Sequence, residues 1–91
     1  MLRVWGSLND AKRIVADAVA ENNETALSET ERLEACLDAL VKRFDLATPI
    51  WLKLNREDID RFGRTSFREE NFIESFPYKS FDIEIIERDE D

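Results

Sequence analysis

Carboxylates are the most abundant side chains in this sequence that could carry out acid–base chemistry, and the chain contains no histidine. The usual general base of catalytic triads and the commonest metal ligand are therefore absent. Acidic pairs such as Asp58 and Asp60 would need a cleft that fixes their separation before they could act as a glycosidase pair. We interpret them as solvated surface carboxylates, with weak binding of a divalent cation as the alternative.

Cys36 is the single cysteine and a second candidate for chemistry. A nucleophilic thiol needs partial exposure and a neighbouring base, whereas Cys36 lies on the apolar side of an expected helix, as a buried structural cysteine does. The two glycines, Gly6 and Gly63, cannot form a GxGxxG or GxxxxGK[ST] phosphate loop. We expect no catalytic residue, no metal, no cofactor and a protein that is not an enzyme.

Four arginines form the only concentration of basic side chains: Arg56, Arg61, Arg64 and Arg68. With Trp51 and Phe67 nearby, such a cluster could contact a nucleotide or a phosphate. Acidic residues alternate with these arginines along the chain, so surface ion pairs are the simpler interpretation.

The chain is acidic, with 21 acidic and 13 basic residues and a formal net charge of −8. Such a charge repels nucleic acid and anionic lipid. A lone cysteine is typical of a reducing compartment. The first residues lack the apolar core of a signal peptide, and no run is long and apolar enough to span a membrane. We expect a cytoplasmic protein that contacts neither membranes nor nucleic acid directly.

One long helix is the element that the sequence defines best. Ser28 and Glu31 have the spacing of a capping box, in which each side chain binds a free backbone N–H of the other. The following residues form one apolar stripe at helical spacing: Leu33, Cys36, Leu37, Leu40 and Phe44. Pro49 marks the limit of this helix, because the residue before a proline disfavours the α conformation.

Three segments alternate apolar and polar residues in the manner of β-strands. Residues 2–7 and 13–21 flank a polar turn and predict a hairpin, although the alanines of the second segment leave a helix as the alternative. Residues 81–86 predict a third strand with one buried face.

Short helices are expected between the long helix and the last strand. One is predicted over residues 56–62, with Asn55 as its N-cap and Phe62 facing inward. The capping-box spacing of Ser66 and Glu69 predicts another from Phe67 to about Ser75.

The predicted fold is α+β, with a small three-stranded, mainly antiparallel sheet in the order β-β-α-α-β. This sheet would pack against one long helix and one or two short ones. Residues 1–91 have the size of a single domain, and residues 87–91 are expected to form a frayed acidic tail.

Four segments carry a resemblance to known proteins: Leu27-Ser28 with Thr30-Glu31, Phe44-Asp45-Leu46, Pro49-Ile50-Trp51-Leu52 and Asn71-Phe72-Ile73-Glu74. With them the chain resembles a family of short uncharacterised proteins of clostridial and related bacteria over most of its length. The resemblance implies a bacterial cytosolic protein and implies no activity, cofactor or functional residue.

The first functional hypothesis is a non-enzymatic protein-interaction domain, such as an adaptor, a regulator or a homodimer. Its partner would be another protein or a second copy of itself, because a small sheet has edges that can pair with another chain. The candidate interaction surface combines the tryptophans with C-terminal acids: Trp5, Trp51, Asp82, Glu84, Glu87, Asp89 and Glu90.

The alternative is an acidic inhibitor that mimics nucleic acid and blocks a nuclease or another DNA-binding protein, as phages encode. A duplex segment of roughly 25–30 Å carries about 15–18 phosphate charges, well above the net charge of −8 in this chain. Mimicry therefore requires the acids to gather on one face, and arginines among them would count against it. A third interpretation, a small enzyme that acts through carboxylates, would need a pocket with convergent acids.

Overall fold

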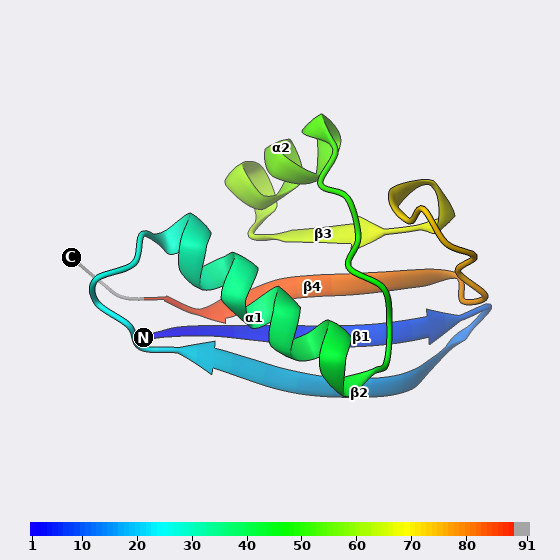
Figure 1. The fold of residues 1–91 in the computed structure, drawn as a ribbon, viewed down its shortest axis with the longest axis horizontal. Helices are drawn as coiled ribbons and strands as arrows, with labels where there is room; N and C mark the ends of the chain where they lie inside the picture. Colours follow the sequence, from blue (N-terminus) through cyan, green and yellow to red (C-terminus); the bar gives the residue numbers. More distant parts are fainter. Residues whose placement is uncertain (89–91) are drawn as a thin grey trace.

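A computed structural model describes residues 1–88 of the chain as a four-stranded antiparallel sheet with two helices (Figure 1). The elements are β1 (Leu2–Asp10), β2 (Arg13–Asn22), α1 (Glu29–Arg43), α2 (Lys53–Phe62), β3 (Arg64–Phe67), the 3₁₀ turn η1 (Glu69–Asn71) and β4 (Ser80–Glu87). The strands lie in the order β2-β1-β4-β3, so β2 and β3 are the edges. The α+β class with an antiparallel sheet is confirmed, but the sheet has one strand more than predicted.

The predicted hairpin of β1 and β2 is confirmed. The two strands pair antiparallel from Leu2 opposite Asn22 to Asp10 opposite Arg13. At the turn, the Asp10 carboxylate accepts a hydrogen bond from the N–H of Ala11 at 3.0 Å. The register shifts near Leu8, where one extra residue of β2 bulges out of the ladder.

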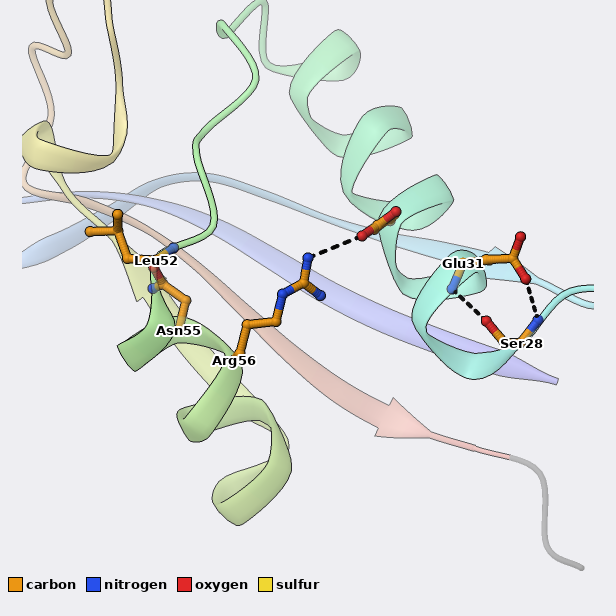
Figure 2. A network of polar contacts seen from close by, with 6 residues as sticks. Ser28, Glu31, Leu52, Asn55 and Arg56 are labelled. Carbon is orange, nitrogen blue, oxygen red and sulfur yellow. Dashed lines mark hydrogen bonds and ion pairs between the residues drawn. The ribbon is translucent and has the colours of Figure 1, made fainter.

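α1 begins at the predicted capping box. The Ser28 Oγ accepts from the N–H of Glu31 at 3.2 Å, and Glu31 Oε1 accepts from the N–H of Ser28 at 3.0 Å (Figure 2). The apolar stripe of the helix packs on β1 and β2. Gly6 permits this close approach, since a Cβ at that position would lie 2.8 Å from a methyl carbon of Leu40.

β3 and η1 occupy the segment in which a helix from residue 67 was predicted, so that prediction is wrong. Arg64 to Phe67 pair with β4, and Phe67 is fully buried against Phe81, with ring centroids 6.0 Å apart. The spacing of Ser66 and Glu69 does not form a capping box, because Ser66 lies within this strand and not at the start of a helix. The N–H of Arg68 donates instead to Asn71 Oδ1 at 3.0 Å.

α2 begins earlier than predicted, at Lys53, and Asn55 lies within it instead of preceding it. Asn55 still satisfies the helix start, because its Oδ1 accepts from the N–H of Leu52 at 3.0 Å. The expected inward position of Phe62 is wrong, since this side chain is 62% exposed. α2 packs on the short edge strand β3 and turns into it directly through Gly63, whose φ is +68°.

The core lies on the α1 side of the sheet. Even-numbered side chains of β1, such as Leu2 and Val4, are buried there, whereas Arg3, Trp5 and Ser7 point to the opposite face. We call this opposite face the open face, because neither α1 nor α2 covers it (Figure 1).

The C-terminal strand extends into the segment that was expected to be a tail. Glu87 is the last residue of β4, and residues 89–91 lie outside the described part of the chain. None of the helices described over residues 1–88 is long and apolar enough to cross a membrane.

Candidate interaction surface

A groove of about 490 Å³ follows the edge strand β3, between α2 and the open face. Its main lining residues come from α2, β3 and the open face: Leu54, Asp58, Phe62, Arg64, Arg68, Trp5, Asp82 and Glu84. Leu54 and Phe62 are 67% and 62% exposed, respectively. Large apolar side chains that surround a concavity are typical of a surface that binds a partner.

Asp82 supplies a polar floor to this groove. Its Oδ2 accepts a hydrogen bond from Asn9 Nδ2 at 3.1 Å. Its Oδ1 is buried and has no hydrogen-bond partner among residues 1–88. Buried polar atoms are nearly always paired in folded proteins, so this oxygen is an unsatisfied acceptor beside the groove.

Trp5 lies at the groove edge on the open face. Its indole N–H donates to Asp17 Oδ2 on the neighbouring strand at 2.9 Å. In the sheet register it stands between Val19 of β2 and Glu84 of β4. The ring is partly buried, so its apolar body remains available for a further contact.

Trp51 lies on the α1 side of the sheet and is part of the core packing. Its ring meets Phe67 edge-on, with centroids 5.1 Å apart, and the Arg56 guanidinium stands 4.7 Å above it. Arg56 also forms an ion pair with Glu34 of α1 at 3.2 Å (Figure 2). The two tryptophans therefore do not form one surface.

The predicted acidic residues are divided among three places. Asp82 and Glu84 line the groove together with Trp5. Glu87 stands 3.8 Å from the Arg3 guanidinium. Asp89 and Glu90 lie outside the described residues.

A buried amide network, which the sequence analysis did not find, fixes the position of α2. Asn55 and Asn71 are 4% and 2% exposed. Asn71 Nδ2 donates to Asn55 Oδ1 at 2.8 Å and to the Ile50 carbonyl at 2.9 Å. Asn55 Nδ2 donates to Thr65 Oγ1 at 2.9 Å and to the Ser66 carbonyl at 3.0 Å. Asn71 gave no sequence signal for this network, because Ile50 and Asn55 lie 21 and 16 residues away in the chain.

Cys36 is 1% exposed, and the prediction of a buried structural cysteine is confirmed. Burial raises the pKa of its thiol, and the negative charge of Glu21 raises that pKa further. The protonated thiol is a poor nucleophile. Within residues 1–88, no group of three or more cysteine, aspartate or glutamate side chains is arranged to hold a metal ion.

No protein-family model, curated protein or solved structure matches this chain. The resemblance to the clostridial proteins therefore stays a prediction.

Proposed function

We propose that this protein is a non-enzymatic protein-interaction domain that binds a segment of another protein along the groove beside β3. One observation carries the proposal: the groove combines two exposed large apolar side chains, Leu54 and Phe62, with the polar floor at Asp82. Apolar anchors surrounded by a few directed polar groups are the usual composition of an energetically important contact region.

The lining of the groove indicates the kind of segment that it would bind. Leu54 and Phe62 offer an apolar wall, while Glu84 offers an acceptor and the Asp82 carboxylate adds negative charge on the other side. A segment with an apolar or aromatic anchor next to a basic or amide side chain complements both. Arg64 would disfavour a purely basic segment and so add selectivity.

The distribution of arginines favours this function over nucleic-acid mimicry. Arg3 stands between Glu21 and Glu87, 3.8 Å from each carboxylate. Arg64 lies opposite Glu84 in the register of β3 and β4. A mimic of a phosphate backbone needs a continuous acidic surface. On the open face, these arginines lie among the acidic side chains and interrupt such a surface.

Affinity capture from the native cell extract, with and without nuclease, tests the proposal. We expect the wild-type chain to retain one stoichiometric protein and Phe62→Ser to retain at least tenfold less of it. Ile73→Ser is the matched control, because Ile73 is 89% exposed and lies away from the groove. Equal retention by all three chains, or retention of no protein, would contradict the proposal. A DNA-binding enzyme retained equally by Phe62→Ser would favour the mimic instead.

A further inference from the structure

The two edges of the sheet are protected unequally. At β3, the Asn55 side chain donates to the outward carbonyl of Ser66, and α2 packs against this edge. β2 is the longer edge strand, with ten residues, and nothing in the described part of the chain pairs with its outer side. Unprotected edge strands pair readily with a further strand.

The register determines which backbone groups point outward from β2. The N–H of Ile85 donates to the Gly63 carbonyl, so odd-numbered residues of β4 bond to β3 and even-numbered residues bond to β1. β1 follows the same alternation, so the residues of β1 that do not bond to β4 bond to β2. The alanines of β2 lie opposite these residues and therefore bond to β1. The N–H and C=O groups of Asp17, Val19 and Glu21 therefore point away from the sheet.

The acidic side chains of this edge are held back toward β1. Asp17 accepts the indole hydrogen bond of Trp5, and Glu21 stands 3.8 Å from the Arg3 guanidinium. Charged side chains normally protect an edge against pairing, but these two are engaged within their own sheet. Val19, which lies between them, is 47% exposed. The edge thus presents backbone groups and an apolar side chain to the outside.

We propose that β2 pairs antiparallel with β2 of a second copy of this chain, about a two-fold axis at Ala18. Outward backbone groups of the two strands face each other only when the axis passes through a residue. Asp17, Ala18 and Val19 are the three residues near the middle of β2 through which the axis could pass. An axis at Asp17 places two Asp17 carboxylates opposite each other, and an axis at Val19 places Asp17 opposite Glu21 of the second copy. An axis at Ala18 places Asp17 opposite Val19 of the second copy.

The Ala18 register therefore avoids directly opposed like charges. The pairs of Asp17 with Val19 of the second copy occur twice and supply about four backbone hydrogen bonds. On the α1 side, alanines face alanines. A two-fold contact of this kind is closed, so it uses both exposed edges and leaves none for further growth. This self-complementarity is the reason that the occupant is a second copy and not the strand of a different protein.

The first test is the mass of the chain in solution, measured by light scattering after size exclusion. We expect the wild-type protein to have the mass of two chains and Val19→Pro the mass of one. Proline at this position removes only an outward N–H, so the bonds to β1 remain. Val19→Thr keeps that N–H and should stay dimeric. Far-ultraviolet circular dichroism checks that Val19→Pro is folded. The proposal is overturned if the wild-type protein is still monomeric at about 100 µM, which is near the upper range of such a measurement, or if Val19→Pro is dimeric.

A cysteine scan tests the register independently. Single cysteines at Asp17, Ala18 or Val19 each face their own copy in only one of the three registers. With oxidised glutathione as the oxidant, we expect Ala18→Cys to form the covalent dimer at least tenfold faster than Asp17→Cys or Val19→Cys. The wild-type chain is the control, because its only thiol, Cys36, is 1% exposed. Faster cross-linking at either flanking position overturns the Ala18 register.

The β2 edge and the groove beside β3 are different surfaces, so the dimer and the interaction through the groove can fail separately. A monomer that still loses its captured protein on Phe62→Ser overturns only the dimer. A dimer that retains no protein overturns only the interaction through the groove. If the wild-type chain is a monomer and captures a protein that Val19→Pro does not retain, the strand that pairs with β2 belongs to that protein and not to a second copy.

Discussion

Asn55 and Asn71 show how a buried polar pair can fix one segment of a small domain. Asn55 uses both acceptor and both donor positions of its amide, with partners in the loop before α2, in β3 and in η1. Thr65 and Asn71 are themselves buried, and Ser66 is partly buried. Removing one amide would leave several of these groups without a hydrogen bond inside the protein.

We therefore predict that Asn55→Ala lowers the free energy of unfolding by about 2–3 kcal/mol, because each unsatisfied buried group costs about 1–3 kcal/mol. Urea denaturation of the variant and the wild type measures the difference. Asn23→Ala, at an exposed loop position, is the control and should change stability by less than about 0.5 kcal/mol. Equal stabilities of the two variants would show that the network contributes nothing.

The capping box predicts a pH dependence of the stability of α1. The backbone N–H of Ser28, and then its hydroxyl, lower the pKa of Glu31 in the folded state. The stabilisation is therefore complete above the ordinary pKa of glutamate and is lost as the pH falls through the lower, folded value. We expect wild type to exceed Glu31→Gln in stability at pH 7 and to lose this advantage in acid. Chemical denaturation across the acidic range measures it, and a constant difference would contradict the assignment.

At the scale of elements, local signals were sufficient for α1 and for the hairpin. Ser28 and Glu31 mark the start of α1 within four residues of chain, and the alternation of apolar and polar side chains over residues 2–7 correctly predicted β1. The strand β3 could not be predicted in this way, because its four residues are mostly polar and become a strand only by pairing with the distant β4.

Helical periodicity also gave the wrong prediction that Phe62 faces inward, so the groove that Phe62 lines could not be predicted. The helical pattern identifies which side chains share a face, but it does not tell whether anything covers that face. α2 lies on an edge strand and not over the centre of the sheet, so Phe62 at its end stays outside the core, whereas Ile59 packs against the core. The candidate site thus depends on tertiary placement. Only Trp5, Asp82 and Glu84 of its lining residues were among the predicted surface residues.

The contact between α1 and β1 gives a prediction about packing. We expect Gly6→Ala to lower the free energy of unfolding by about 1–3 kcal/mol, the usual cost of one extra carbon in a filled core. The added methyl would meet Leu40. Leu40→Ala in the same chain should make the cost of Gly6→Ala smaller than in the wild type. A double-mutant cycle measured by denaturation provides the test, and strict additivity would argue against the contact.

At the scale of the whole molecule, the proposed dimer contact and the groove lie at opposite edges of the sheet. A dimer formed through β2 would carry one groove at each end, so it could hold two copies of a partner at once. On a surface that carries many copies of the partner, linked sites rebind before the complex separates.

We predict that the wild-type protein dissociates from such a surface at least tenfold more slowly than Val19→Pro. Both proteins should bind a single soluble partner segment with equal affinity, because β2 does not line the groove. Surface plasmon resonance measures the first comparison and calorimetry the second. Unequal affinities in solution would show that the edge and the groove are coupled.

The placement of the two tryptophans on opposite faces of the sheet has an optical consequence. Trp5, beside the groove, is partly exposed and hydrogen-bonded to a carboxylate, whereas Trp51 packs against Phe67. Trp51→Phe would leave a fluorophore that responds to ligands on the open face, and Trp5→Phe one that responds to loosening of the core. A spectral change confined to Trp5 would mark occupancy of the groove, and one confined to Trp51 would mark an early step of unfolding.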